Sequence, residues 1–376
     1  MIVLMLLARA YDNNLELAFT NILSSDHSNN SDRVIAGGSY PVMDRSPREG
    51  RQDRKGWYPA TERTYSRVLT LRHITIEVVV KNCVKHGEGP HWDDTTQCLY
   101  YVDMFVDDVH RYNAVTGQDS RLNLGDSVAS VIIPRQKGGF VVSQKTDLGL
   151  LDSWESGKVT SIAKVEADAN MFNDGKVDAS GRLWIGSCFC GNGIADPNKW
   201  LKLQGSLYSL DSDGSVKKHI SNISIGNGMD WTDDNSVMYY IDSIPRQVWA
   251  FDFNITAGSI SNKRTVADFS STEIPDLGYP DGMAIDTEGK LWVACFDAGK
   301  VVRLDPETGK VIRTVKFPCE KITSCCFGGE DFTDLYVTST PYMMTEAELE
   351  KTPLAGSIFK VTGLGVRGRK ANMFSG

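Results

Sequence analysis

Long apolar runs are missing from this sequence, which argues against a helix that spans a membrane. No stretch approaches the roughly 18 apolar residues that such a helix needs. The apolar start, Met1–Leu7, is short, lacks a basic segment before it and is soon followed by polar residues, which argues against a signal peptide. We therefore expect a cytoplasmic protein with no membrane partner, and secretion is the alternative.

An excess of positive charge is also missing. The chain has 40 Lys and Arg residues against 48 Asp and Glu residues, which gives a formal net charge of −8. A protein that binds the phosphate backbone of a nucleic acid presents a basic surface. The sequence therefore argues against nucleic acid as a partner.

Three motifs of common active sites and metal sites are absent. The eight cysteines include no C-x-x-C pair, so a zinc site of that type is not predicted. We expect buried free thiols of a reducing compartment rather than a disulfide framework. The sequence has no G-x-S-x-G nucleophile elbow and no P-loop, so it predicts neither of those two kinds of site.

An apolar period of 3.6 residues is not seen in any long stretch, and short strands take its place. These strands are rich in Val, Ile, Tyr and Trp and are separated by Gly or Asp turns. Clear examples are Cys98–Asp103, Phe140–Ser143, Leu183–Gly186, Val237–Ile241, Leu291–Ala294 and Leu335–Thr338. The one helix that we expect is short, at Thr345–Lys351. The predicted fold class is all-β.

Residues 1–72 differ in composition from the rest of the chain. After the apolar start they are polar, with a charged run at Arg45–Lys55, and they show no alternation of strands and turns. Such a segment offers little apolar surface to offset the entropy lost on ordering. We expect a poorly ordered N-terminal extension, with a targeting segment as the alternative, and we place the folded domain at residues 73–376.

The folded part repeats one pattern six times. Each copy has a turn-like or polar start, an apolar strand, a turn and a second apolar strand. The copies begin near Gly87, Val128, Phe172, Gly226, Pro280 and Thr323. They recur about every 42 to 54 residues, which is the range of propeller blades. The sequence therefore predicts a six-bladed β-propeller with four strands per blade, because a large β-sandwich does not explain the repeat.

Oxygen-bearing side chains occupy the same place in four of the repeats. They are Glu88, Asn173, Asn227 and Asp281. The first strand of each blade lines the channel of a propeller, so equivalent positions converge on its axis. Carboxylate and amide oxygens suit a hard divalent cation such as Ca²⁺, Mg²⁺ or Mn²⁺. The set has no imidazole and no thiolate and so does not favour a dedicated zinc site.

Turn formation is the alternative explanation for part of this set. Asn-Gly and Asp-Gly are ordinary turn formers, and Asn227-Gly228 and Asp281-Gly282 have that form. Glu88 is different, because a Glu between two glycines has no evident role in a turn. Four oxygen donors at one repeat position favour a metal site over four unrelated turns.

The chain from about Cys83 to Gly368 resembles the family of regucalcin (senescence marker protein), the gluconolactonases and the insect luciferin-regenerating enzymes. The runs that carry the resemblance are Gly87–Pro90, Phe172–Asp178, Asn227–Trp231, Tyr239–Ser243, Pro280–Asp286, Leu291–Cys295, Ser324–Gly329 and Thr362–Val366. Gly87–Trp92 and Gly278–Gly282 look most similar to the insect branch.

The resemblance implies a site and an activity. It implies one divalent metal held by Glu88, Asn227 and Asp281, with Asn173 in contact with the substrate and Asp281 active in proton transfer. Calcium is the metal we favour, with Zn²⁺, Mn²⁺ or Mg²⁺ as alternatives. The substrate class is a lactone. We therefore expect a metal-dependent lactonase that acts as a monomer on a small-molecule lactone.

Two positions depart from the family pattern. The family usually has an Arg two residues before the Asn of its Phe-Asn-Asp-Gly run, and this chain has Met171. Mammalian members place a substrate-binding Glu where this chain has Gly191. Neither residue offers the polar contact that it replaces. We expect a less polar substrate than gluconolactone, or weak lactonase activity.

Other functions stay open. One is a calcium-binding regulatory protein with little catalysis, and another is an enzyme of the luciferin-regenerating type. A third is a propeller whose face binds proteins, although such a face has no need of a ring of oxygen ligands. We expect His86 and His91, which flank Glu88, to have surface or packing roles.

Four charged residues near the repeats are expected to brace turns and strands beneath the channel. They are Asp174, Lys176, Asp178 and Asp242.

Overall fold

The predicted propeller is confirmed by six separate four-stranded sheets. The computed structural model describes residues 73–125, 128–167, 169–190, 203–271, 276–342 and 344–376. The predicted N-terminal extension, residues 1–72, lies outside this part of the chain and stays a prediction. No helix in the described ranges is long and apolar enough to cross a membrane.

The first three blades follow one another along the chain. Blade 1 consists of β2 (Gly87–Asp93), β3 (Cys98–Asp103), β4 (Asp108–Asn113) and β5 (Gln118–Asn123). Blade 2 consists of β6 (Ile132–Pro134), β7 (Phe140–Gln144), β8 (Asp147–Leu151) and β9 (Val159–Lys164). Blade 3 consists of β10 (Asn170–Val177), β11 (Leu183–Phe189), β12 (Gly205–Leu210) and β13 (Val216–Ile223).

The remaining blades complete the ring. Blade 4 consists of β14 (Gly226–Trp231), β15 (Val237–Asp242), β16 (Gln247–Asn254) and β17 (Ser259–Asp268). Blade 5 consists of β18 (Tyr279–Ile285), β19 (Leu291–Phe296), β20 (Lys300–Asp305) and β21 (Lys310–Lys316). Blade 6 consists of β22 (Ile322–Gly328), β23 (Asp334–Ser339), β24 (Ile358–Thr362) and, from the other end of the domain, β1 (Thr75–Val80).

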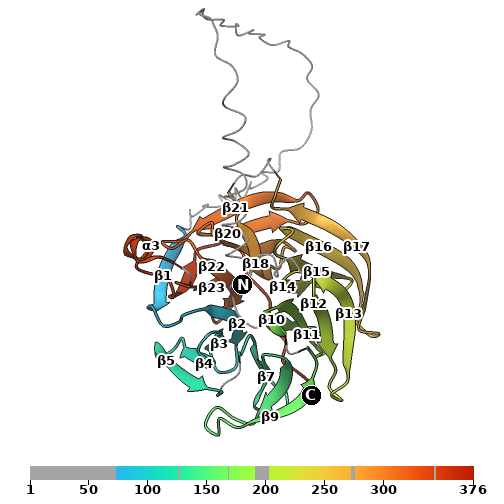
Figure 1. The fold of residues 1–376 in the computed structure, drawn as a ribbon. Coiled ribbons are helices and arrows are strands. Elements are labelled where there is room, and N and C mark those ends of the chain that lie inside the picture. Colours follow the sequence, from blue (N-terminus) through green and yellow to red (C-terminus); the bar gives the residue numbers. More distant parts are fainter. Residues whose placement is uncertain (1–72, 126–127, 168, 191–202, 272–275, 343) are drawn as a thin grey trace, which may run out of the picture. The chain divides into compact units, whose positions relative to one another are not determined.

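Blade 6 closes the ring because it joins both ends of the domain. Strand β1 pairs antiparallel with β24, from Thr75 opposite Thr362 to Val80 opposite Ile358. Figure 1 shows the blue β1 beside the red strands of the C-terminal part. Ladder hydrogen bonds between the first and last strands thus hold the six sheets in a circle.

The first strand of each blade lies nearest the axis. These strands contact one another across blade boundaries: β2 contacts β6 and β22, and β18 contacts β14 and β22. In Figure 1 they gather around the centre. The second strands β3, β11 and β19 are buried at every position because neighbouring blades cover both faces. The outer strand β21 instead alternates between exposed and covered residues.

Local sequence signals place the turns as expected. Asp178 accepts hydrogen bonds from the Ser180 N–H at 2.9 Å and from the Trp184 indole at 2.8 Å, so it braces the turn between β10 and β11. Asp242 accepts the Ser224 and Ile225 N–H groups in blade 4. The predicted bracing roles of these two carboxylates are confirmed.

The other two bracing residues and the short helix are also described. Lys176 ties Asp230 to the Met283 carbonyl, so it braces strands of three blades. Asp174 accepts its hydrogen bond from the N–H of the next residue, Gly175. The expected helix is α3 (Glu346–Lys351), which begins at a capping box formed by Thr345 and Glu348. All eight cysteines are free, as predicted, and six of them are buried.

The C-terminal tail, residues 366–376, runs under one end of the channel and contacts all six blades. Its backbone or side chains form hydrogen bonds with residues of every blade. In the order of blades 1 to 6 these residues are Asp94, Pro134, Gly181, Trp231, Thr287 and Phe332. Near its end, Phe374 is 1% exposed and lies in a cluster with Val131, Ile133 and Phe172. The tail therefore adds apolar contacts between blades that the sheet ladders do not supply.

Replacing Phe374 with Ala should lower the free energy of unfolding by about 3–5 kcal/mol, the usual cost of removing a buried Phe side chain. Urea denaturation measures the change. Met373→Ala is the control, because its side chain is only half-buried on the same tail. Equal losses in the two variants would show that the tail is not anchored through Phe374.

A second prediction concerns acid stability. His219 on β13 stacks on Trp184 at 4.2 Å and its Nε2 lies 2.8 Å from the Ser209 hydroxyl. Burial, reinforced by Lys217 and Arg182, lowers the pKa of His219 to about 4. The unfolded state therefore takes up the proton first, so stability present above about pH 6.5 is lost as the pH falls toward 4.

His219→Gln should be less stable than the native protein at pH 7.5, and this difference should shrink by roughly 1–2 kcal/mol at pH 4.5, allowing for the partial exposure of the ring. Denaturant titrations at the two pH values measure it. Buried carboxyl groups are common to both proteins and cancel in the comparison. A difference that is constant with pH would contradict a neutral His219.

Candidate metal centre

Six equivalent side chains face the axis, one from each blade. The register between first and second strands places six pairs at one level: Trp92–Leu99, Pro134–Phe140, Val177–Leu183, Trp231–Met238, Ile285–Leu291 and Phe327–Leu335. Four residues earlier along the chain lie Glu88, Ser130, Asn173, Asn227, Asp281 and Thr323, all at most 3% exposed. We call these six residues the axial ring. All six are polar, although they are buried.

The backbone is irregular where the axial ring lies. The pairing of first and second strands shifts by one residue between Glu88 and His91, and equivalent shifts occur at Phe172/Gly175, Gly226/Met229 and Pro280/Met283. A β-bulge of this kind re-aims a side chain and interrupts the ladder. The bulges therefore interrupt the ladder at Asn173, Asn227 and Asp281, and directly after Glu88, which still pairs with Val102.

The turn explanation for the Asn-Gly and Asp-Gly pairs is wrong. Asn227-Gly228 and Asp281-Gly282 lie inside strands β14 and β18. Both glycines are needed because the next blade approaches closely. A Cβ on Gly282 would lie 1.9 Å from the Ser324 hydroxyl, and one on Gly228 would lie 2.5 Å from the Met283 nitrogen. The glycines thus allow the inner strands to converge on a narrow axis.

Two members of the axial ring have their hydrogen bonds satisfied within the protein. The Ser130 hydroxyl lies 2.8 Å from that of Ser143, and the Thr323 hydroxyl donates to the Gly87 carbonyl at 2.6 Å. These two residues need no further partner. Ser130 and Thr323 are therefore structural members of the ring, and the other four members are the candidates for binding a ligand.

The other four members have buried oxygens without a hydrogen-bond partner among the described residues. These atoms are Glu88 Oε1, Asn173 Oδ1, Asn227 Oδ1 and both carboxylate oxygens of Asp281. Leaving a buried acceptor unpaired costs about 1–3 kcal/mol, and more for a charged group. So many unpaired acceptors in one ring make it a candidate site for a cation.

The two amide side chains are oriented by bonds to the next blade. The Asn173 Nδ2 donates to the Gly226 carbonyl at 3.0 Å. The Asn227 Nδ2 donates at 3.0 Å to the Ser243 hydroxyl, which in turn donates to the Pro280 carbonyl at 2.7 Å. One N–H of each NH₂ group is held in this way, which fixes the orientation of the amide, and the amide oxygens have no partner in the described ranges. Ser243 therefore fixes the direction of a candidate ligand from outside the ring.

Burial and neighbouring carboxylates raise the proton affinity of both carboxyl groups of the ring. Burial, together with the charges of Asp281 and Asp174, raises the pKa of Glu88 well above its usual range. Burial, with a contribution from Asp174, does the same to the pKa of Asp281. The pKa of Asp174 itself is raised to about 6, because burial outweighs the nearby Lys176. A divalent cation would offset this repulsion and stabilise the ionised pair.

The donor set fits a hard cation and not a soft one. It combines two carboxylates with two amide oxygens, which suits Ca²⁺ and similar ions. Within the described ranges no group of three or more His, Cys, Asp and Glu side chains is placed to hold a metal ion. Half of the donors here are amides, so the candidate centre does not depend on such a group.

The four predicted site residues therefore occupy one ring, as the repeat indicated. The sequence did not single out Ser243 as an orienting residue, although it lies in the run Tyr239–Ser243 that contributed to the family resemblance. It also gave no reason to expect Ser130 and Thr323 at the same level. Only the cross-strand register reveals them.

A largely apolar layer lies next to the ring. Met171, Ile225 and Tyr279 each stand two residues before a ring member, namely Asn173, Asn227 and Asp281. These three belong to one buried cluster. Met171 is 5% exposed. The second departure from the family pattern, Gly191, lies outside the described residues.

His86 is the polar member of this layer. It is fully buried, its ring lies 4.6 Å from that of Phe105 and 6.1 Å from that of Tyr342, and neither ring nitrogen has a partner in the described part of the chain. Burial lowers the pKa of His86 well below its usual range. The surface alternative is therefore wrong for His86, whose neutral ring packs against Phe105 and Tyr342.

Comparisons with known proteins agree with this geometry. Residues 86–341 match the family described as SMP-30/Gluconolactonase/LRE-like region. The chain is 43% identical to regucalcin from Danio rerio over 307 residues, which is 81% of this chain and 100% of the relative. A solved luciferin-regenerating enzyme is similar with a TM-score of 0.73 and 35% identity, over 81% of this chain and 100% of that one.

A bacterial structure is similar as well. A calcium-binding protein, regucalcin from Agrobacterium tumefaciens, has a TM-score of 0.72 and 25% identity, over 80% of this chain and 97% of that one.

Removing a predicted ligand should weaken metal binding, whereas removing a satisfied ring residue should not. Loss of one partner of a buried charge pair costs about 3–5 kcal/mol, so Asp281→Asn should weaken Ca²⁺ binding by roughly 100-fold or more. Asn227→Ala should weaken it as well. Isothermal titration calorimetry measures both.

Ser130→Ala is the matched control, because Ser130 lies at the same level of another blade. Its Ca²⁺ affinity should stay within about threefold of the native value. A loss as large as that of Asp281→Asn would mean that the ring acts through its packing and not through the four unpaired donors.

Proposed function

Because this chain belongs to the SMP-30/gluconolactonase/LRE-like family, we propose that it is a divalent-metal-dependent hydrolase of lactone-type substrates. The observation that carries the proposal is the set of buried, unpaired oxygens from four blades, which belong to Glu88, Asn173, Asn227 and Asp281. Glu88, Asn227 and Asp281 hold the metal, and Asn173 contacts the substrate. The metal is Ca²⁺ in this proposal.

The chemistry follows from the positions of these side chains. A divalent cation bound there polarises a carbonyl oxygen and lowers the pKa of a bound water. Asp281 is fully buried, and both of its oxygens lack a partner in the described ranges, so its carboxylate is available to accept a proton. In lactone hydrolysis the water oxygen bonds to the carbonyl carbon and gives its proton to Asp281. Asp281 returns the proton to the ring oxygen as the C–O bond of the lactone breaks.

Asn173 differs from the metal ligands in its proposed role. Its amide oxygen lies in the axial ring, and its Nδ2 is held by the Gly226 carbonyl of the next blade. Because that bond fixes the orientation of the amide, Asn173 presents an acceptor and is suited to a substrate hydroxyl. It therefore positions the lactone beside the metal in this proposal.

The layer above the ring points to a substrate with an apolar part. Met171 lies where the family usually has an Arg, and it packs in the same cluster as Ile225 and Tyr279. A thioether cannot donate hydrogen bonds to the hydroxyls of a sugar lactone. We therefore assign the protein an aromatic or aliphatic lactone in preference to an aldonolactone.

A calcium-binding protein without turnover is the second candidate. The similar regucalcin from Agrobacterium tumefaciens is a calcium-binding protein, and Met171 in this chain removes a polar substrate contact. The two candidates share the same metal ligands. The two candidate functions differ in whether Asn173 and the apolar layer bind a substrate.

A panel of lactones tests the proposal. With Ca²⁺, Mn²⁺ or Zn²⁺ supplied in turn, we expect metal-dependent hydrolysis with a higher kcat/KM for dihydrocoumarin and aliphatic lactones than for gluconolactone. Met171→Arg should move this ratio toward gluconolactone by about tenfold or more, since a charge-assisted hydrogen bond contributes about 1.5–3 kcal/mol. Met171→Leu, which stays apolar, should leave the ratio unchanged.

Two outcomes would contradict the proposal. Fast turnover of aldonolactones alone would show that the apolar layer does not select the substrate. Tight Ca²⁺ binding with no hydrolysis of any lactone would favour the second candidate. Asn173→Ala separates the roles further: it should lower kcat/KM by about tenfold or more and leave the Ca²⁺ affinity within about threefold.

A further inference from the structure

A second cavity lies on the axis at the other end of the inner strands. It has a volume of about 240 Å³. Five blades contribute residues three or four positions beyond the axial ring, among them His91, Lys176, Asp230, Ala284 and Cys326. At about 3.3 Å per residue this cavity lies on the order of 10 Å from the ring along the strands. The C-terminal tail supplies the remaining wall.

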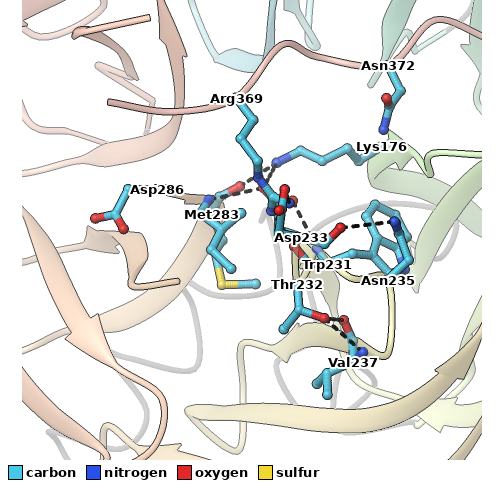
Figure 2. Close-up of polar contacts among 12 residues, drawn as sticks. Lys176, Trp231, Thr232, Asp233, Asn235, Val237, Met283, Asp286, Arg369 and Asn372 are labelled. Carbon is cyan, nitrogen blue, oxygen red and sulfur yellow. Dashed lines mark hydrogen bonds and ion pairs between the residues drawn. The ribbon is translucent and has the colours of Figure 1, made fainter. Parts of the chain in front are cut away.

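The tail and the inner strands place cationic groups in the same space. Figure 2 shows Lys176 from β10 and Arg369 from the tail converging, with Asn372 beside them. Three cationic side chains, those of Lys176, Arg369 and Lys370, line the cavity together with two carboxylates, those of Asp230 and Asp233. Lys370 is neutralised by Asp94, which lies outside the lining, so the cations nearest the cavity are Lys176 and Arg369, paired with Asp230 and Asp233.

The carboxylate deepest in this cavity already has its partners. Asp230 Oδ2 accepts from the Lys176 Nζ at 2.8 Å and from the Ile285 N–H at 3.1 Å, and Oδ1 accepts from the Trp231 N–H. Lys176 uses one further proton on the Met283 carbonyl at 2.8 Å. An ammonium has three protons, so one donor of Lys176 is left over.

Further donors at this site lack an acceptor. Arg369 directs one terminal nitrogen to Asp233 and the other to the Trp231 carbonyl, with Asp230 Oδ1 4.0 Å from that second nitrogen, and its Nε–H has no hydrogen bond to the described residues. The imidazole of His91 is 8% exposed and has no hydrogen bond to the described residues. Burial lowers its pKa to about 4, so the ring is neutral and carries one N–H donor.

The walls between these polar groups are aromatic and aliphatic. Trp92, Trp231, Ile285 and Phe327 all line the cavity. The two tryptophans are 1% and 4% exposed, and their indole N–H groups have no partner in the described ranges. Buried indoles usually find one, as Trp184 does with Asp178. The site thus combines unmatched donors with apolar surface.

We propose that this cavity is a second binding site, for a small organic anion with an apolar body, such as an aryl or alkyl carboxylate. The carboxylate lies against Lys176 and Arg369, and the apolar body lies on the walls formed by Trp92, Trp231 and Phe327. A volume of about 240 Å³ is below that of pockets for drug-sized ligands, which points to a metabolite and not to a peptide. The proposal does not depend on the lactone chemistry.

The site shares the axis with the metal centre but not its residues. A smaller cavity of about 20 Å³ shares Pro90, His91 and Lys176 with it and adds Asp174 on the side of the ring. None of the four unpaired members of the axial ring lines either of these two cavities. Binding at the two ends can therefore be measured separately.

Phenylacetate is a suitable probe, and phenylacetamide is its neutral counterpart. Ligand-observed NMR titrations of the full chain at low salt should give saturable phenylacetate binding with a dissociation constant on the order of 1 mM. Phenylacetamide should bind about tenfold more weakly, because it lacks the charge that strengthens the hydrogen bonds. Lys176→Met and Arg369→Gln should each weaken phenylacetate binding by about tenfold or more.

Lys360→Met is the matched control. Lys360 pairs with Glu77 at 2.9 Å, and its side chain is 27% exposed, close to the 30% of Lys176. This variant should bind phenylacetate as the native protein does. Arg369→Gln keeps the test decisive if Lys176→Met does not fold, because Arg369 lies on the tail and not in a sheet.

Two results would overturn the proposal. One is absence of saturable binding, or equal binding by the native protein, Lys176→Met, Arg369→Gln and Lys360→Met. The other is binding that is lost in Asn227→Ala and kept in Lys176→Met, which would place the probe at the metal centre.

Discussion

The pairing of β1 with β24 is the contact on which the arrangement of this molecule depends. The two strands come from opposite ends of the domain, Thr75–Val80 and Ile358–Thr362, and their ladder completes blade 6, so that both ends of the domain are held in one sheet. Only a closed ring brings six first strands to a common axis. The candidate metal centre depends on that convergence, because each of its proposed ligands comes from a different blade.

Convergence of the strands also explains the unusual polarity of the core. Inner strands approach so closely that a Cβ on Gly282 would overlap the Ser324 hydroxyl. At this narrow level the ring residues are buried, and two of the six are satisfied by neighbouring hydroxyl or carbonyl groups. The other four keep oxygens without partners in the described part of the chain. The free-energy cost of burying unpaired polar groups is thus concentrated at these four residues, where a bound cation would offset it.

The axis differs in character from one end to the other. Near the ring, unpaired acceptors of Glu88, Asn227 and Asp281 favour a cation. At the far end, unmatched donors of Lys176, Arg369 and His91 favour an anion. The tail that covers this end also touches all six blades. One short segment therefore contributes both to cohesion of the ring and to the chemistry of the second cavity.

The sequence by itself determined the fold class and the four donor residues. Strand and turn signals recur with a blade-length period, and Glu88, Asn173, Asn227 and Asp281 stand at one place in the repeat, so periodicity alone predicted their convergence. The sequence also allowed turns at Asn227-Gly228 and Asp281-Gly282, and that interpretation was wrong. Local turn preference cannot show that a neighbouring blade lies against a glycine.

Tertiary structure decided the rest. Ser243 orients Asn227 across a blade boundary, and the anion cavity joins Lys176 to Arg369, which is far away along the chain. Contacts between distant residues depend on how the strands meet in space, and no local pattern records that.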